Sequence, residues 1–253
     1  MTSSLGLDGK AAVITGGTRG LGRAIARKLC ASGCSVVLSY AQSDADAQEA
    51  VRSLRDLPGE ARAAKGDVRQ PDVLQALADT ALDRYGRLDI VVHNAATLPA
   101  MSVLGPDLDA MHQEQELALN PLLAGAAIFA KAMSGKGGRI IGISGNGARR
   151  AIPGYVALGV AKAALESLIR YLAVELAPQG IAVNAIATAL LDKGVPNDMV
   201  PPQAIAMLAA RTPAGRLTTP ADVADAVALL STTEAGWIHG QVIMVDGGLG
   251  LRA

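Results

Sequence analysis

Apolar positions along the chain follow two alternating periods. Short runs rich in Val, Ile, Leu and Ala predict buried strands, because strands covered on both faces read as nearly continuous apolar segments. Such runs occur at Ala11–Ile14, Ser35–Tyr40, Ala61–Lys65, Asp89–His93, Arg139–Ile143, Ile181–Ile186 and Gln241–Val245. Between them, apolar residues recur at helical spacing and predict helices. Examples are Leu21, Ala24, Ile25 and Leu29, and later Leu165, Leu168, Ile169, Leu172 and Leu176.

This alternation of strand and helix predicts the fold class. Strands that alternate with helices form a parallel sheet with helices on both faces. No linker, charge block or repeat interrupts the series. We therefore expect a single doubly wound α/β domain over residues 1–253, built on a seven-stranded parallel sheet flanked by helices.

The most irregular stretch runs from Ala187 to Pro213 and contains Gly194, Pro196, Pro201 and Pro202. It follows a predicted strand, so it should begin at the carboxyl edge of the sheet, where ligands of open α/β sheets bind. Two interpretations stand side by side. The stretch is a substrate-side loop that covers the ligand, or it is an ordinary surface excursion.

Composition and charge narrow the class of protein. Half of the residues are hydrophobic and only 2% are aromatic, so Ala, Val, Leu and Ile must build the core. The formal net charge is zero, which gives no electrostatic reason to expect nucleic acid or a membrane as partner. The sequence shows no secretory signal or membrane span, and we expect a cytoplasmic protein with reduced cysteines. Three scattered histidines give no basis for a metal site.

A glycine-rich segment between the first strand and the first helix is the strongest local motif. It reads Thr15-Gly-Gly-Thr-Arg-Gly-Leu-Gly22. Glycines at 16, 20 and 22 permit a tight turn and let the backbone approach a pyrophosphate. Free N–H groups at the start of the helix can then receive the negative charge. This position after a strand and before a helix favours a dinucleotide site over a plain turn.

The motif TGxxxGxG resembles the fingerprint of the short-chain dehydrogenase/reductase family, and further matches follow in the family's order. Asp67-Val68 is similar to its adenine-contacting pair, and His93-Asn-Ala-Ala96 to its NNAG motif, which braces the sheet beside the cofactor. Asn120 falls where the family places an active-site Asn. The segments 211–216 and 245–248 also match, so the resemblance covers essentially the whole chain and implies a Rossmann-type domain. The cofactor contacts that it implies are Gly16, Thr18, Arg19, Gly20, Leu21, Gly22, Tyr40, Ser43, Asp67, Val68, Asn94, Ala95 and Lys162.

The choice between NADPH and NADH depends on the end of the second strand. An acidic residue there would bind the adenosine ribose and repel a 2′-phosphate. Here the strand ends in Ser39-Tyr-Ala-Gln-Ser43, without an acid, and Arg19 supplies positive charge as in NADP(H)-using relatives. Asp44 and Asp46 lie close in sequence and oppose that charge. We expect NADPH as cofactor, with NADH as the weaker candidate.

The expected catalytic pair has an unusual spacing. Most of the family carries Tyr-x3-Lys on the helix after the fifth strand, but Leu158 stands four residues before Lys162. The nearby tyrosine is Tyr155, which gives Tyr-x6-Lys. Seven residues at about 100° each return to nearly the same helix face after a rise of roughly 10.5 Å. Tyr155 and Lys162 are therefore expected to share one face, with the phenol one turn beyond its usual place.

That displacement favours one reaction. In reduction of a 2-enoyl thioester, hydride goes to the β-carbon and charge develops on a more distant oxygen, so the donor should stand further from the nicotinamide. The stretch Gly159–Leu176 and the Tyr-x6-Lys spacing resemble type III enoyl-acyl-carrier-protein reductases. By that resemblance, Tyr155 contacts the thioester oxygen or enolate in fatty-acid or secondary-metabolite biosynthesis. Lys162 holds the ribose hydroxyls, and its charge would favour phenolate character in the nearby tyrosine.

Two departures from the family keep other functions open. Gly145 stands in the usual position of the active-site Ser, with Ser144 one place too early, and Ala187-Thr-Ala189 replaces the usual Ser-Pro-Gly. Contacts to the nicotinamide are therefore expected to differ. One alternative is a short-chain reductase of a ketone, imine or other activated double bond. Another is an NADP(H)-binding sensor or partner protein without turnover.

Partners follow from the same resemblance. The substrate would be a small thioester carried by coenzyme A or by acyl carrier protein. A homo-tetramer is implied, with the predicted Ala- and Leu-rich helix from Pro153 to Ala177 as its interface. Tyr85, Tyr171 and Trp237 are expected to serve packing.

Overall fold

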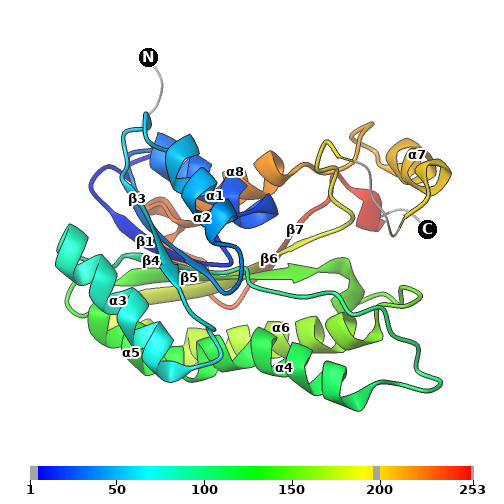
Figure 1. The fold of residues 1–253 in the computed structure, drawn as a ribbon, viewed down its shortest axis with the longest axis horizontal. Helices are drawn as coiled ribbons and strands as arrows, with labels where there is room; N and C mark the ends of the chain where they lie inside the picture. The colour runs from blue at the N-terminus through cyan, green and yellow to red at the C-terminus, as the bar shows by residue number, and fades with distance from the viewer. Residues whose placement is uncertain (1–4, 196–199, 252–253) are drawn as a thin grey trace.

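In the computed structural model, which describes residues 5–195 and 200–251, seven parallel strands form one sheet in the order β3-β2-β1-β4-β5-β6-β7 (Figure 1). The strands are β1 (Ala11–Thr15), β2 (Ser35–Tyr40), β3 (Ala61–Lys65), β4 (Ile90–His93), β5 (Gly138–Gly145), β6 (Ile181–Thr188) and β7 (Val242–Val245). All seven predicted strands are confirmed. The central strands β5 and β6 run further than predicted, because residues 187 and 188 are still buried and still pair with Ser144 and Gly145.

Helices cover both faces of the sheet (Figure 1). The α-helices are α1 (Gly20–Ala31), α2 (Asp44–Ser53), α3 (Pro71–Tyr85), α4 (Leu108–Leu123), α5 (Gly125–Ala132), α6 (Val156–Leu176), α7 (Pro202–Arg211) and α8 (Pro220–Leu230). Short 3-10 turns are η1 (Asn146–Ala148), η2 (Ala177–Gln179), η3 (Glu234–Trp237) and η4 (Leu249–Leu251). Helices α1, α2 and α8 pack on one face, and α3 to α6 pack on the other. The doubly wound fold class is therefore confirmed.

Alternation along each strand divides the core into two layers. Side chains of successive strand residues point to opposite faces. Thus Ile14 packs with α1 and α8, whereas its neighbour Val13 packs with α3 and the helices beside it. Cys30 and Cys34 lie in the first layer as free, buried thiols, and burial raises the pKa of Cys30 to about 12. Within the described residues, no helix is both long and apolar enough to cross a bilayer.

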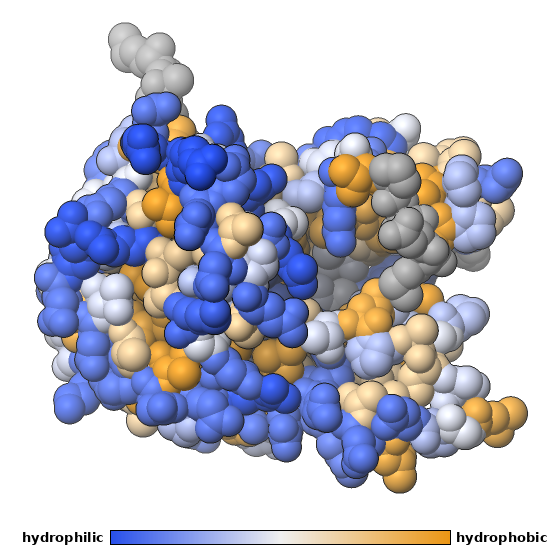
Figure 2. Space-filling view, in the orientation of Figure 1, coloured by the Kyte–Doolittle hydropathy of each residue, from blue (hydrophilic) through white to orange (hydrophobic). Residues whose placement is uncertain are grey.

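The stretch expected to be an irregular loop contains a helix. Residues 202–211 form α7, which begins with a proline at its first position, where the missing N–H costs nothing. The helix stands apart from the sheet on the side where the C-terminus lies, and Figure 2 shows this face hollowed beside it. Part of the predicted substrate-side loop, residues 196–199, lies outside the described residues. That interpretation stays a prediction.

The aromatic residues do not all pack inside. Tyr85 is partly buried, and its hydroxyl donates to the Val36 carbonyl at 3.4 Å. Tyr171 is 67% exposed and Trp237 is 95% exposed. The expectation that these two residues pack within the chain is therefore wrong, because both side chains stand on outward faces of short or amphipathic helices.

Candidate functional site

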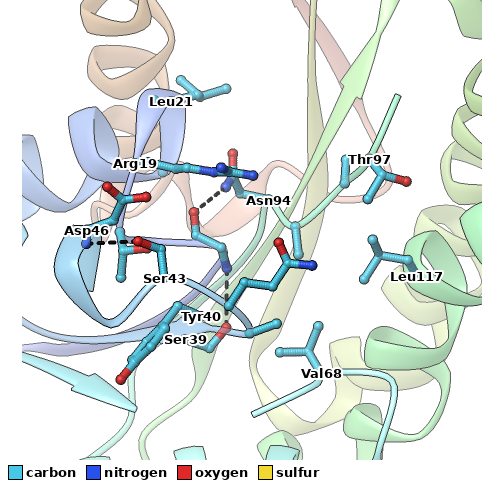
Figure 3. A pocket seen from close by; sticks show the side chains of 18 of the residues that line it. Arg19, Leu21, Ser39, Tyr40, Ser43, Asp46, Val68, Asn94, Thr97 and Leu117 are labelled. Carbon is cyan, nitrogen blue, oxygen red and sulfur yellow. Dashed lines mark hydrogen bonds between the residues drawn. The ribbon is translucent and has the colours of Figure 1, made fainter. Parts of the chain in front are cut away.

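A cavity of about 610 Å³ lies at the carboxyl ends of β1, β2 and β4 (Figure 3). The predicted cofactor contacts, apart from Lys162, all line this nucleotide cavity. Segments that are far apart in sequence meet there because parallel strands end at one edge of the sheet. Leu117 and Lys193 also line it but were missed by sequence reasoning. Lys193 comes from the expected substrate-side loop, and its place in that loop was the one feature of the sequence that could have indicated a contact with the cavity.

The glycine loop is held in place from behind. Asn94 donates through its side chain to the carbonyl oxygens of Thr15 and Gly16, at 3.1 and 3.0 Å. A Cβ on Gly22 would lie 2.1 Å from the Gly16 oxygen, so only glycine allows the helix to start this close to the loop. The loop is therefore braced by the same segment that the family resemblance assigned to this task.

The front of the loop is shaped to receive an anion. A Cβ built on Gly20, whose φ is +51°, would meet nothing within 4 Å, so the space before it is open. Helix α1 begins at this glycine without any side chain capping its first N–H groups. Unpaired N–H groups and the helix dipole favour a phosphate at such a position. The cavity thus fits the pyrophosphate of a dinucleotide.

Charges at the far end of the cavity bear on the 2′-phosphate. The Asp44 carboxylate accepts from the Tyr40 hydroxyl at 2.9 Å and from Lys65 Nζ at 3.0 Å. These two partners hold the pKa of Asp44 below its usual value, and Lys65 pairs with its negative charge. Asp46 and Arg19 both line the cavity, and Arg19 forms no ion pair with any described residue. The guanidinium is thus free for an anion, whereas one carboxylate still opposes it.

The predicted adenine contacts differ in character. Val68 is 5% exposed and presents an apolar wall to the cavity. The Asp67 carboxylate is held by Arg69 through its backbone N–H and its guanidinium, at 2.6 to 3.0 Å. That pairing lowers the pKa of Asp67 and anchors the turn after β3.

Lys162 reaches the site from helix α6, which packs on one face of the sheet. Its side chain is buried, and Nζ donates to the Ile143 carbonyl of β5 at 2.7 Å. Burial lowers the pKa of Lys162 to about 8, and the charge of Glu114 offsets part of that effect. Its ammonium is therefore fixed at the carboxyl half of β5, with two further N–H donors available.

Tyr155 precedes helix α6 instead of lying within it. The helix begins at Val156, and Tyr155 occupies the N-cap position with φ −109° and ψ 10°. Its ring lies against Gly147, where a Cβ would come within 2.4 Å of the ring. Its hydroxyl lies 3.5 Å from the place that a Cβ on Gly145 would take. The phenol thus reaches the end of β5, two residues beyond the carbonyl that binds Lys162. Tyr155 and Lys162 nevertheless do not lie in one regular helix.

The protonation of Tyr155 differs from the expectation. Burial, and next the negative charge of Glu114, raise the pKa of the phenol. The direction of this shift is opposite to the expected phenolate character, because burial disfavours the charged phenolate. A neutral phenol is a proton donor at neutral pH.

Ser144 faces away from this site. Its hydroxyl donates to Glu166 Oε1 at 2.9 Å, and Arg149 Nε donates to the other carboxylate oxygen at 3.0 Å. This network ties β5, the turn after it and α6 together on the side of the sheet that α6 covers. Ser144 therefore does not replace the serine that is missing at 145, as its position one residue early predicted.

One buried polar side chain near the site, Glu114, was missed by sequence reasoning. Glu114 of α4 is 1% exposed, and its Oε2 accepts from the backbone N–H of Thr97 at 3.2 Å and from the Thr97 hydroxyl. Its Oε1 is buried without a hydrogen-bond partner among the described residues. No motif marks a Glu at this position. Only the rarity of a polar residue on a buried helix face signals it.

His93 of β4 contacts helix α4, and Asn120 lies on that helix. His93 is fully buried, accepts from the Thr15 hydroxyl at 3.0 Å and donates to the Ala118 carbonyl at 3.1 Å. Burial and the Lys162 charge lower its pKa to about 3, so it is neutral. Asn120 is half-buried on α4 before Pro121, and its side chain has no hydrogen bond to any described residue. Its role at the site stays a prediction.

Comparison with known proteins identifies the family. A family model described as enoyl-(acyl carrier protein) reductase matches residues 16–250. The chain is 39% identical over 249 residues to 1-cyclohexenylcarbonyl-CoA reductase of Streptomyces collinus, covering 95% of this chain and 87% of that protein. It is 30% identical to the L-rhamnose 1-dehydrogenase (NAD(P)(+)) of a Sphingomonas species, covering 96% and 97% of the two chains. A short-chain dehydrogenase/reductase variant of Serratia marcescens superposes with a TM-score of 0.86 at 30% identity, over 96% of this chain and 98% of that one. The chain therefore belongs to the short-chain dehydrogenase/reductase family and is an oxidoreductase of the kind that binds a nicotinamide dinucleotide.

Proposed function

We propose that this protein is an NADPH-dependent reductase that saturates the 2,3 double bond of an enoyl thioester. The observation that carries the proposal is the place of the Tyr155 hydroxyl, a neutral phenol beside the side-chain position that Gly145 leaves empty. A ketone reductase of this family would present a serine there. The relative from Streptomyces collinus supports the same reaction, since its name places a ring double bond next to a thioester carbonyl.

The residues divide the chemistry between them. The bound dinucleotide supplies the hydride. Tyr155 donates a hydrogen bond, and then its proton, to the oxygen on which negative charge develops, which is the enolate of the thioester. Lys162 of α6, whose Nζ is fixed by the Ile143 carbonyl of β5, holds the ribose hydroxyls, and Asn120 completes the catalytic set that the resemblance implies. The residues lining the nucleotide cavity position the dinucleotide.

NADPH is the proposed cofactor because Arg19, which forms no ion pair with any described residue, lines the cavity beside the end of β2. The carboxylate of Asp44 is occupied by Tyr40 and Lys65, so it no longer opposes a 2′-phosphate. Asp46 remains as an opposing charge, which predicts a preference for NADPH and not an absolute requirement. Among the described residues, no acidic residue other than Asp46 lines the cavity at the end of β2.

A paired assay tests the function. Purified protein is mixed with NADPH or NADH and with matched 2-enoyl and 3-keto thioesters of coenzyme A, and nucleotide absorbance is followed. We expect turnover of the enoyl set, faster with NADPH. Turnover of the 3-keto set alone would exclude the proposal. Binding of NADPH without turnover of either set would favour the sensor alternative.

Substitution of the phenol tests the proton donor. Tyr155→Phe keeps the ring that packs on Gly147 and removes only the hydroxyl, so folding and nucleotide binding should be unchanged. We expect kcat to fall by about 10²–10⁴-fold, the range for a general acid. Full activity in this variant would exclude Tyr155 as the donor.

The second candidate function is a short-chain reductase of a ketone, and one comparison favours it. The relative from Sphingomonas is a sugar dehydrogenase, so the same architecture serves alcohol and ketone chemistry.

For this chain we propose a coenzyme A or acyl-carrier-protein thioester as substrate and a homo-tetramer as the working assembly. Exposed apolar side chains on α6 support that assembly, among them Tyr171 and Val174.

A further inference from the structure

A second cation, Lys193, lines the nucleotide cavity together with Arg19. Among the described residues that line the cavity, Lys193 is the only one that follows Leu117 in the chain. It therefore reaches the cavity from the part of the fold that includes β5, β6 and β7. Its side chain is exposed and forms no ion pair with any described residue. Exposed lysines are ordinarily solvated, so a place on the cavity wall is the feature that needs an explanation.

The chain is anchored directly before this lysine. The Asp192 backbone N–H donates to the Thr218 carbonyl at 2.8 Å, and Leu191 forms a β-bridge with the same threonine. The Asp192 carboxylate accepts from the Gly194 N–H at 2.9 Å and does not line the cavity. The fold thus presents the ammonium to the cavity, whereas its acidic neighbour is turned to the backbone.

The same segment lies on the face of the sheet that carries α1. Leu191 packs against the core layer built with α1 and α8, and Leu21, at the start of α1, packs against that layer too. Lys193 therefore approaches the cavity on the side of the first N–H groups of α1. The open space before Gly20 lies there, which fits a pyrophosphate.

The other charges that line the cavity do not balance a pyrophosphate. Each of its two phosphates carries a negative charge, whereas a helix N-terminus supplies only about half a positive charge. Arg19 is assigned to the 2′-phosphate, and Asp46 and Asp67 add no positive charge. Lys193 is the other cation among the described lining residues. An ammonium binds phosphate as a point charge with three donors.

We propose that Lys193 is a cofactor-binding residue whose ammonium pairs with the pyrophosphate of the dinucleotide. The inference rests on the proposed function for the bound dinucleotide and for the assignment of Arg19 to the 2′-phosphate. The two cations then serve different parts of the ligand. Arg19 distinguishes NADPH from NADH, and Lys193 binds both. The ion pair also joins the segment after β6 to the nucleotide.

Ligands that lack one part of NADPH test this contact. NADH lacks the 2′-phosphate, and ADP-ribose lacks the nicotinamide as well, but both keep the pyrophosphate. We expect Lys193→Gln to raise the Kd of all three ligands by a common factor of about ten, as for loss of a hydrogen bond to a charged group. Arg19→Gln should raise the Kd of NADPH alone. Fluorescence titration measures the reduced nucleotides, and calorimetry measures ADP-ribose. A rise of less than about threefold for NADH or ADP-ribose in Lys193→Gln would overturn the proposal.

Two further variants control for charge and fold. Lys193→Arg keeps a cation and should recover most of the affinity that Lys193→Gln loses. Lys131→Gln removes an exposed lysine from α5, on the other face of the sheet, and should leave the three Kd values unchanged. A Lys193→Arg protein that binds as weakly as Lys193→Gln would overturn the proposal. An equal loss in Lys131→Gln would do the same, because net charge and not a contact would then govern affinity.

Acetylation of lysines measures the contact in the wild-type protein. The exposed Lys193 should react with N-hydroxysuccinimidyl acetate, and saturating ADP-ribose should slow that reaction at Lys193 but not at Lys131, as measured by peptide mass spectrometry. An equal rate at Lys193 with and without ADP-ribose would overturn the proposal. None of these measurements needs an enoyl substrate. A protein that binds dinucleotides but reduces only 3-keto thioesters would refute the proposed reaction, and the role of Lys193 would still be decided.

Discussion

At the scale of single residues, burial has the largest effect on the titration of Tyr155 and Lys162, and the charge of Glu114 modifies both. Its carboxylate raises the pKa of both Tyr155 and Lys162. The pKa of Lys162 is about 8, below its usual value because of burial. As pH rises through that value the ammonium loses its proton, so activity should fall on the alkaline side with a midpoint near pH 8. Glu114→Gln removes the charge that supports the ammonium and should move this limb to lower pH.

The pH profile of kcat/KM is the measurement for this prediction. Among the neighbouring ionisable groups, His93 is neutral, and the Glu166 carboxylate is tied to Ser144 and Arg149. Thr97→Val is the matched control, because it removes a hydrogen bond to Glu114 but leaves the charge. An alkaline limb at the same pH in Glu114→Gln and wild type would contradict the electrostatic role.

Residues inside motifs were predictable, and residues defined only by tertiary contact were not. The glycine loop, Asn94, Tyr155 and Lys162 occupy places fixed by spacing to a strand or helix. Glu114 carries no such spacing. It becomes notable only when its burial and its oxygen without a described partner are known, which depend on elements distant in sequence.

At the scale of elements, the turn between β5 and α6 sets the position of the phenol. Gly147 in η1 supports the Tyr155 ring, and a Cβ there would come within 2.4 Å of it. Gly147→Ala must therefore displace the ring. We expect kcat to fall at least about tenfold, since small misplacements of a reacting group are costly, with nucleotide affinity unchanged.

The neighbouring glycine is a matched control for this prediction. A Cβ on Gly145 meets the Tyr155 hydroxyl at 3.5 Å, an ordinary contact, so Gly145→Ala should be far less harmful. Steady-state kinetics and nucleotide titration of the two variants give the comparison. Equal kcat values for both alanine variants would contradict the proposal that η1 positions the ring.

Prediction of the elements succeeded where apolar pattern decides and failed at their ends. The core strands followed from their continuous apolar runs, and the stripe of Leu165, Ile169 and Leu172 marked α6. The start of α6 at Val156 did not follow, because residues 149–155 are held by long-range contacts. The backbone N–H of Met101, for example, donates to the Gly154 carbonyl at 2.9 Å. Helix α7 was hidden by its flanking prolines.

At the scale of the whole molecule, two groups of exposed apolar side chains lie on opposite faces of the sheet. Face A, on α4 and α6, comprises Leu123, Val160, Tyr171 and Val174, which are 42–76% exposed. Face B, on α8 and η3, comprises Leu229 and Trp237, which are 58% and 95% exposed. Groups of this kind mark contact surfaces. The proposed homo-tetramer would need two such surfaces, since a D₂ assembly uses at least two different two-fold contacts.

Charged substitutions on face A and face B are expected to lower the mass of the assembly, to a dimer singly and to a monomer together. Val174→Lys places a charge in face A and should leave only contacts through face B, which yields dimers. Trp237→Lys disrupts face B and should leave only contacts through face A, which also yields dimers. The double variant should be monomeric. Light scattering after size exclusion measures each mass. The active-site residues lie at the strand ends, away from both substitutions, so nucleotide affinity in the dimers serves as the folding control. A tetramer that persists in the double variant would show that other surfaces hold the assembly together.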